Sequence, residues 1–148
     1  MTLGKAIICD IDGTVALMHG NRTPFEWMKV DTDLPNQWVI DLLCAYTYGN
    51  DITVLFLSGR SEECYDLTLD WLNEHVMHGY MEPHGFKLFM RPVDQLFEKD
   101  AKIKYEFYHG YIKPYYDVQF VIDDRKQVVD MWRNVAGLPV AQVAEGNF

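Results

Sequence analysis

Residues 7–14, with the sequence IICDIDGT, form an apolar run that ends abruptly in two carboxylates, a glycine and a threonine. This pattern constrains the fold because a β-strand delivers acidic groups to the edge of a sheet in this way. Strand side chains alternate between two faces, so Asp10 and Asp12 project to the same side. Gly13 then permits a sharp exit that keeps the backbone close to a ligand. The alternative interpretation is a surface strand end with turn-forming residues.

Two further apolar runs end in polar residues, which weakens that alternative. Residues 52–57 and residues 118–122 both have the pattern of buried strands. The polar residues that directly follow them are Ser58, Gly59, Arg60, Asp123 and Asp124. In open α/β sheets, ligands bind outside the carboxyl ends of the strands, where these side chains and the first acidic pair would converge. The sequence therefore predicts a site at one edge of a sheet.

Apolar runs alternate with segments of helical periodicity, which predicts an α/β fold with a mostly parallel central sheet between two layers of helices. The expected strands are residues 6–11, 52–57, 86–90, 118–122 and 140–143. The expected helices run from Pro35 to Gly49, from Ser61 through Leu72, from about Asp100 to Ile112, and from Lys126 to Val135. Trp71 and Trp132 are expected in the core. A length of 148 residues fits one domain, residues 1–148.

Residues 13–34 show no clean period and contain Gly20, Asn21 and Pro24. A segment of this length without regular structure is often functional. We therefore expect a loop or a small cap, inserted after the first strand and lying over the site.

The bulk composition limits the classes of partner. A net charge of −9 argues against a broad nucleic-acid surface, although a divalent cation at the acidic strand ends would offset part of it and a narrow surface remains possible. The cysteines Cys9, Cys44 and Cys64 are odd in number and widely spaced, which predicts reduced thiols and a cytoplasmic protein. The first apolar run is too short for a secretory signal or a membrane span, so no membrane partner is expected.

The chemistry of the strand ends favours Mg²⁺ and a phosphate. Carboxylate oxygens without soft ligands suit Mg²⁺, which keeps several waters and often bridges to a substrate phosphate. The candidate metal ligands are Asp10, Asp12, Asp123 and Asp124, and these residues leave open which of the last two contacts the metal directly. An Asp10 nucleophile also needs a cation on its other flank, because phosphate repels a carboxylate, and Lys104 or Lys102 would supply it.

Ser58 and Arg60 are candidate phosphate-binding groups. Ser58 would donate to a phosphoryl oxygen, and Arg60 offers planar donors to the phosphate or the adjoining substrate backbone. The alternative for Arg60 is a solvated charge at the start of a helix. A glycine-rich phosphate loop ending in Lys-Ser or Lys-Thr is absent from the sequence, so kinase activity within these residues is not expected.

These residues resemble the motifs of the haloacid dehalogenase (HAD) superfamily of aspartyl-phosphate enzymes. Residues 10–14 are similar to its first motif, Ser58 to its second, a lysine to its third and the Asp123–Asp124 pair to its fourth. The resemblance implies a HAD-like sandwich and covalent catalysis. Asp10 would attack phosphorus to give an acyl phosphate, and Asp12 would protonate the leaving oxygen and later activate water.

Residues 57–60, 121–133 and 142–148 look like the phosphatase domain of phage polynucleotide kinase-phosphatases, which remove a 3′-terminal phosphate from nucleic acid. The resemblance implies that Lys104, rather than Lys102, is the motif lysine. It implies a 3′-phosphorylated nucleic-acid end as the substrate, and action in the host cytoplasm if the chain is phage-encoded.

The resemblance also assigns roles to individual side chains. Asp124 would be the inner-sphere metal ligand, together with the Asp10 carboxylate and the main-chain carbonyl of Asp12. The implied substrate-binding residues are Thr14, Arg22, Ser58, Gly59, Arg60, Asp100 and Arg125. Asp100 would orient Lys104 or a substrate-side arginine. Arg22 matches a family arginine with one extra residue intervening, Arg125 is alternatively a solvated helix-start charge, and Arg91 is a further possible polynucleotide contact.

Two other functions fit the same sequence. The chain could hydrolyse mononucleotides or other small phosphate esters, because the superfamily site binds the phosphoryl group while the cap determines which substrate is accepted. Alternatively, it could be a non-catalytic binding module that retains the fold. The second alternative is weaker, since the acids and the lysine of the motifs are all present.

Overall fold

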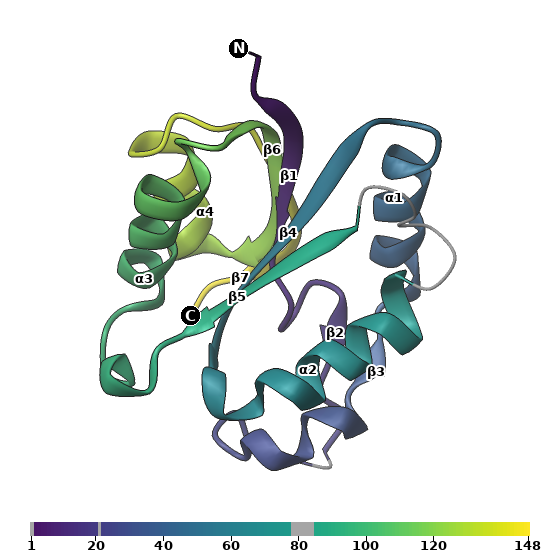
Figure 1. Cartoon of the computed structure of the whole chain (residues 1–148). Helices are drawn as coiled ribbons and strands as arrows, with labels where there is room; N and C mark the ends of the chain where they lie inside the picture. The colour runs from purple at the N-terminus through teal and green to yellow at the C-terminus, as the bar shows by residue number, and fades with distance from the viewer. Residues whose placement is uncertain (1, 21, 78–84) are drawn as a thin grey trace.

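The computed structural model describes residues 2–20, 22–77 and 85–148. Its centre is a parallel sheet of five strands in the order β5, β4, β1, β6, β7 (Figure 1). The strands are β1 (Gly4–Cys9), β4 (Ile52–Ser61), β5 (Phe86–Arg91), β6 (Tyr116–Arg125) and β7 (Val140–Gly146). Strand order reverses beside β1, because β4 and β5 extend the sheet to one side and β6 and β7 to the other. Such a switch point is where open α/β sheets bind ligands.

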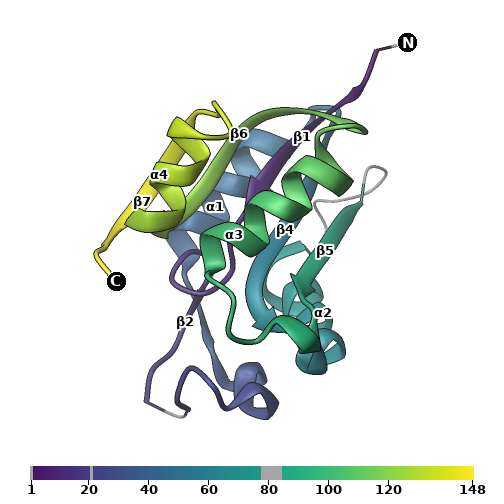
Figure 2. The same ribbon diagram turned by 90° about the vertical axis from the view of Figure 1, so that its left-hand side faces the viewer.

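Helices cover both faces of this sheet (Figures 1 and 2). The helices are α1 (Gln37–Thr47), α2 (Tyr65–Leu72), α3 (Asp100–Phe107) and α4 (Lys126–Asn134), and short helical turns η2 (Glu62–Cys64), η3 (Asn73–Met77), η4 (Val93–Gln95) and η5 (Tyr108–Ile112) adjoin them. Alternate side chains of β1 supply the two layers, with Ile7 and Cys9 in one hydrophobic cluster and Ala6 and Ile8 in the other. The predicted HAD-like α/β sandwich with a mostly parallel sheet is confirmed.

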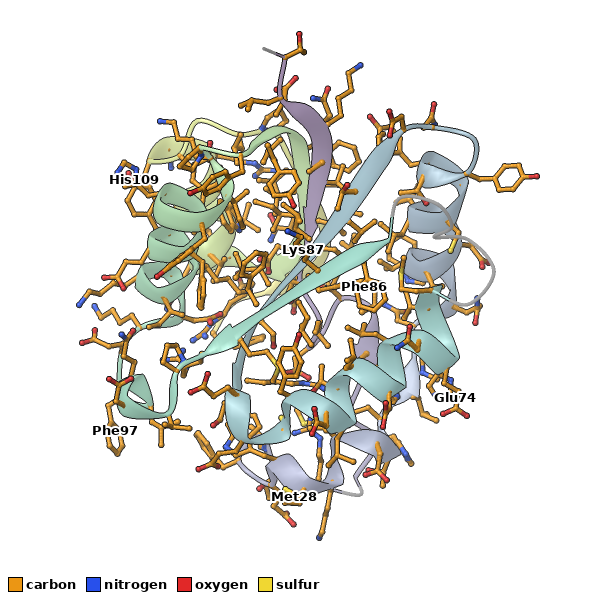
Figure 3. All side chains as sticks on the ribbon, viewed as in Figure 1. Met28, Glu74, Phe86, Lys87, Phe97 and His109 are labelled. Carbon is orange, nitrogen blue, oxygen red and sulfur yellow. The ribbon has the colours of Figure 1, made fainter. Side chains whose placement is uncertain are left out.

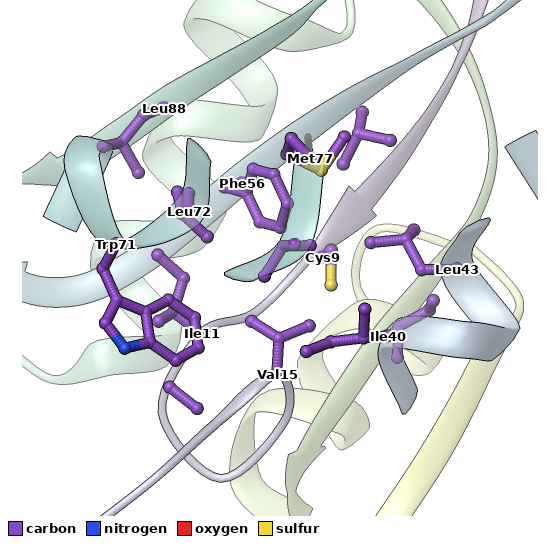
Figure 4. Packing of buried hydrophobic residues seen from close by; sticks show 14 of the residues in the cluster. Cys9, Ile11, Val15, Ile40, Leu43, Phe56, Trp71, Leu72, Met77 and Leu88 are labelled. Carbon is purple, nitrogen blue, oxygen red and sulfur yellow. The ribbon is translucent and has the colours of Figure 1, made fainter. Parts of the chain in front are cut away.

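Both tryptophans that the sequence places in the core are buried. Trp71 packs in the cluster beneath α1 and α2, where Figure 4 shows it beside Ile11. Trp132 lies in the opposite cluster with its ring fully covered. The three cysteines are also buried and free.

A small cap follows β1, as the aperiodic sequence predicts. It consists of the antiparallel pair β2 (Ala16–Leu17) and β3 (Leu34–Pro35) with the short helix η1 (Trp27–Thr32) between them. The first helix was expected to begin at Pro35 but begins at Gln37, because Pro35 pairs with Ala16 in the cap sheet, where the edge of a two-stranded pair tolerates proline. Asn36 bridges the two parts by donating from Nδ2 to the carbonyl oxygen of Thr14 at 2.8 Å.

The other boundaries differ from expectation mainly where strands reach the site. β1 ends at Cys9 and not at Ile11, so Asp10 and Asp12 follow the strand and do not share one of its faces. β4 continues four residues beyond Leu57, to Ser61, and β6 continues through the acidic pair to Arg125. Ser61 caps the turn η2 by accepting from the backbone N–H of Glu63, as its position in the sequence indicates. In the described part of the chain, no helix is long and apolar enough to cross a membrane.

Candidate active site

The carboxyl ends of β1, β4 and β6 open into a cavity of about 530 Å³. The cap forms one wall, and Arg125 at the end of β6 together with Phe148 after β7 lines another. The expected site residues that line the cavity are Asp10, Asp12, Arg22, Gly59, Arg60, Asp100, Lys104, Asp123, Asp124 and Arg125. Two expected residues, Thr14 and Ser58, are buried behind the cavity surface. The strand-end argument therefore brings the acids and the cations to one place.

Asp10 lies at the floor of the cavity between a lysine and a threonine. Its Oδ1 accepts a hydrogen bond from Lys104 Nζ at 2.8 Å, and its Oδ2 accepts one from Thr14 Oγ1 at 2.9 Å. Lys104 reaches it from α3 and is 1% exposed. Lys102 is exposed and pairs with Glu98 instead, at 3.0 Å. Of the two lysines considered, only Lys104 contacts the acidic strand ends.

The acidic pair at the end of β6 divides into two different environments. Both oxygens of Asp123 are occupied: Oδ2 accepts from Lys104 Nζ and Trp132 Nε1, each at 3.3 Å, and Oδ1 accepts the backbone N–H of Asp124 at 2.8 Å. The carboxylate of Asp124 accepts a longer bond, at 3.3 Å, from the Thr14 hydroxyl, which also donates to Asp10. Asp123 is thus held in place, whereas Asp124 has capacity for a further ligand.

Asp10, Asp123 and Asp124 each offer one oxygen within 4.8 Å of the others, and all three are buried. We call these three residues the acidic cluster. Burial, followed by the charge of Asp123, raises the pKa of Asp10 well above its usual range. Burial and the same neighbour raise the pKa of Asp124. The pKa of Lys104 is raised although burial opposes it, because Asp10, Asp100 and Asp123 surround it.

The acidic cluster fits a hard divalent cation. Three carboxylates face one lysine within the described site, so the cluster carries uncompensated negative charge that a bound cation would neutralise. All of its donors are oxygens, which suits Mg²⁺. Gly13 brings the backbone against this cluster with a φ of 81°, and a Cβ there would collide with the carboxylate of Asp124. Only glycine satisfies both conditions without strain.

Asp12 lies in the opposite kind of environment. Arg60 donates to its Oδ1 from Nη2 at 2.8 Å and to its Oδ2 from Nε at 3.1 Å, and Arg22 adds a bond from Nη2 at 3.2 Å. Burial alone would raise the pKa of Asp12, but Arg60 and then Arg22 outweigh it and lower the pKa below its usual value. Arg60 is completely buried, so the alternative that it is a solvated charge is wrong.

Asp33 joins the two arginines and was not anticipated from the sequence. It accepts from Arg22 Nε and Nη2 and from Arg60 Nη2, all at 2.8 Å. Trp71 Nε1 donates to its backbone carbonyl at 3.0 Å and fixes it to the core. We call Asp12, Asp33, Arg22 and Arg60 the arginine cluster. Nothing in the spacing of the cap residues distinguishes Asp33 from the exposed Asp31. The sequence therefore gives no indication that Asp33 pairs with the two arginines.

The remaining expected residues lie around the cavity with different partners. Ser58 Oγ accepts the backbone N–H of Arg60 at 3.0 Å and so stabilises the end of β4. Arg125 contacts Asp100 at 3.9 Å with a third of its side chain exposed. Arg91, considered as a polynucleotide contact, is buried and donates to the carbonyl oxygens of Gly59 and Gln95, both at 2.9 Å. Its donors are therefore used to hold the loop after β5 against the site.

Asp100 lies against Gly59 near the end of β4, where a Cβ would collide with its Oδ1. Its carboxylate is 3.6 Å from Lys104 Nζ and 3.5 Å from Arg91 Nη2. It therefore places a negative charge between Lys104, Arg91 and Arg125.

Comparisons with known proteins identify the family of the chain. Residues 4–148 match the family model described as the polynucleotide kinase PNKP phosphatase domain. A protein of Autographa californica nuclear polyhedrosis virus, named putative bifunctional polynucleotide kinase/RNA ligase, is 36% identical over 132 residues. That match covers 88% of this chain and 18% of the viral protein, so the chain spans less than a fifth of its relative.

Solved structures give the same assignment. Chains in two structures of the Pnkp1/Rnl/Hen1 complex, one titled an RNA repair complex, match 99% of this chain at 36% identity, with TM-scores of 0.84 and 0.85, while this chain covers 44% and 48% of them. A class C acid phosphatase from Bacillus anthracis shares the fold alone, at 14% identity and a TM-score of 0.55. The chain therefore belongs to the family of PNKP phosphatase domains, a HAD-type phosphatase family.

Proposed function

We propose that the chain is a Mg²⁺-dependent phosphohydrolase that removes the 3′-terminal phosphate from DNA or RNA ends through an aspartyl-phosphate intermediate. The observation that carries this proposal is the position of Asp10, which lines the cavity with Lys104 on one oxygen and Asp124 beside it. A carboxylate held by a lysine at the floor of an open cavity is placed to attack an incoming phosphorus atom.

Asp10 and Asp12 divide the chemistry between them. An oxygen of Asp10 forms a bond to phosphorus as the bond from phosphorus to the 3′-oxygen breaks, and Asp12 donates a proton to that leaving oxygen. Asp12 then takes a proton from a water whose oxygen attacks phosphorus and releases Asp10. The arginines hold Asp12 ionised in the free protein. The phosphate that enters competes for Arg22 and Arg60, which raises the pKa of Asp12, so that Asp12 takes up a proton from solvent and then donates it to the leaving oxygen.

The acidic cluster is the proposed Mg²⁺ site. Bound Mg²⁺ would neutralise the charge of the phosphate and of the carboxylates, so that Asp10 approaches phosphorus without repulsion. Asp124 is the preferred inner-sphere ligand, with the Asp10 carboxylate and the main-chain carbonyl of Asp12, because both oxygens of Asp123 already accept hydrogen bonds. Asp123 instead positions Lys104.

A nucleic-acid end is the proposed substrate because of the family and of the names of its relatives, two of which refer to RNA. The site needs to admit only a terminal phosphate and one or two nucleotides, which an acidic chain accommodates. The proposed substrate contacts are Thr14, Arg22, Ser58, Gly59, Arg60, Asp100 and Arg125, with Thr14 and Ser58 acting from behind the cavity surface.

The test compares phosphate release, with Mg²⁺, from a 3′-phosphorylated oligonucleotide, a 5′-phosphorylated oligonucleotide and a free nucleotide. Preferred release from the 3′-end supports the proposal. Preference for the free nucleotide would assign a small-ester phosphatase, and no turnover of any substrate would favour the binding module. Asp10→Asn must abolish release, while the matched variant Asp31→Asn, at an exposed cap residue, must retain it.

A further inference from the structure

The cavity that contains the acidic cluster also carries exposed aromatic side chains, one from the cap and one from the segment after β7, and we call the two together the aromatic wall. Phe25 of the cap and Phe148, which follows β7, both line it although they are 81% and 65% exposed. Leu17, Met18 and Trp27 continue the apolar lining. Single exposed apolar residues are common on protein surfaces, but a cluster of them inside a cavity that also holds charged side chains indicates a surface that binds a ligand.

Phe25 and Phe148 differ from other exposed apolar residues because they line the same cavity as Asp10, and not because they are more exposed. Phe97 and Met28 are also exposed, at 101% and 71%, but they lie on the outer surface, where Figure 3 shows both side chains pointing away from the protein. Neither of them lines the cavity. Phe97 is therefore a natural control for the two phenylalanines that share the cavity with Asp10.

The rings of Phe148 and Phe25 are each held by a neighbouring side chain. The guanidinium of Arg125 lies 5.1 Å from the ring centroid of Phe148, and its Nε donates to the backbone carbonyl of Phe148 at 2.6 Å. The ring of Phe25 packs edge-on against Trp27, with centroids 6.2 Å apart and an interplanar angle of 83°. Arg125 occupies one face of the Phe148 ring, but 65% of Phe148 and 81% of Phe25 stay exposed and can contact a ligand, and rings held by such contacts lose little side-chain freedom on binding.

We propose, resting on the function proposed above, that this aromatic wall stacks the base of the nucleotide whose 3′-phosphate enters the acidic cluster, with Phe25 and Phe148 as the stacking residues. A cavity of about 530 Å³ has room for one nucleotide. Every base has a π-face, so stacking binds nucleic acid without selecting a sequence. It also supplies affinity to a chain of net charge −9, which is poorly suited to contact many phosphates.

A paired substrate tests the role of the base. One oligonucleotide carries a normal 3′-phosphorylated nucleotide, and its partner is identical except that the terminal nucleotide is replaced by a tetrahydrofuran abasic analogue, which cannot lose its phosphate by β-elimination. We expect kcat/KM of the parent chain to be about tenfold higher for the end with a base. Phe25→Leu and Phe148→Leu should move this ratio towards one, because leucine keeps an apolar side chain but loses the π-face. Phe97→Leu should leave the ratio unchanged.

The outcomes separate this inference from the proposed function. Equal turnover of both ends by the parent chain, or a ratio that neither substitution lowers, would overturn base stacking alone. No release from either end, together with rapid release from a phosphotyrosine peptide, would overturn the proposed function and the stacking that rests on it, since phosphotyrosine also joins a phosphate to an aromatic ring. A ratio lowered by either substitution supports stacking and assigns that residue.

Discussion

Asp10 and Asp12 are two residues apart in the sequence, yet they lie in opposite electrostatic environments. Asp10 shares its surroundings with Asp123 and Asp124 and one lysine. Asp12 shares its surroundings with one carboxylate, Asp33, and two arginines. In the acidic cluster the negative charges exceed the positive ones, whereas in the arginine cluster the two are equal in number.

The two clusters differ in how far other side chains of the protein balance their negative charges. The arginine cluster has its full set of partners within the protein, and it stabilises the ionised form of Asp12. The acidic cluster raises the pKa values of Asp10 and Asp124, which means that its charged form is disfavoured until a cation or a proton is added. One cluster is therefore part of the stable fold, and the other is prepared for ligands at some cost in stability.

The same substitution in the two clusters gives the largest contrast. Asp10→Asn and Asp12→Asn should each lower phosphate release by roughly 10⁴-fold or more, because both side chains take part in the proposed chemistry. Their effects on stability should have opposite signs in the absence of Mg²⁺. Asp10→Asn removes repulsion and should raise the midpoint of thermal unfolding, whereas Asp12→Asn leaves two arginines with one carboxylate and should lower it.

Asp31→Asn is the control for both variants, since Asp31 is exposed and outside the two clusters. Its activity and its unfolding midpoint should match those of the parent. The comparison between the clusters fails if Asp10→Asn and Asp12→Asn shift the midpoint in the same direction.

Arg60→Gln should give the largest loss of stability. Arg60 and Asp33 are both buried, so the substitution leaves a buried carboxylate without one of its partners, which costs about 3–5 kcal/mol in the free energy of unfolding. Urea denaturation measures this value. Arg133→Gln changes an exposed arginine that donates to the carbonyl oxygen of Val140, and it should cost no more than about 0.5 kcal/mol. Equal effects of the two substitutions would show that the arginine cluster does not stabilise the fold.

The two clusters also differ in how far the sequence predicts them. Every member of the acidic cluster directly follows or ends an apolar strand run, and parallel strands gather their carboxyl ends at one edge. That rule is local and periodic, so Asp10, Asp123 and Asp124 could be placed from the sequence. The residues alone left Lys104 and Lys102 both open, and only the resemblance to the HAD motifs selected Lys104, which the structure places against Asp10.

The arginine cluster depends on the cap, which has no period from which to derive its path. Asp33 reaches both arginines only because β2 and β3 pair and fold the cap back over the site. For the same reason, the burial of Arg60 could not be foreseen from a position at the end of a strand. Contacts that depend on the tertiary path of an irregular segment are the part that sequence patterns do not determine.

Mg²⁺ should stabilise the protein through the acidic cluster alone. At about 100 times its dissociation constant, a ligand that binds only the folded state adds about 2.7 kcal/mol to the free energy of unfolding. We expect this increase in the parent and in Asp12→Asn, whose proposed metal contact is a main-chain carbonyl. Asp124→Asn should lose most of it. Thermal unfolding with and without Mg²⁺ measures the difference, and equal stabilisation of Asp124→Asn would remove Asp124 from the metal site.

The smallest expected effect is a difference in pH dependence between the two aspartates, measured by urea denaturation in a chelator. The folded-state pKa of Asp12 lies below its unfolded value, so its contribution to stability is present at neutral pH. That contribution is lost as the pH falls below about 3.9 and through the folded-state pKa. Its size should be modest because the side chain of Asp12 is 37% exposed and screened by solvent.

Asp10 should show the opposite sign. Its folded-state pKa lies above the unfolded value, so its charge destabilises the fold at neutral pH, and the protein regains stability as the pH falls through the folded-state pKa. The free energy of unfolding of the parent minus that of Asp12→Asn should therefore be positive at neutral pH. The parent minus Asp10→Asn should be negative, and both differences should shrink as the pH falls. If both differences in the free energy of unfolding had the same sign at neutral pH, the two clusters would not differ in charge balance, even though their hydrogen-bond partners differ.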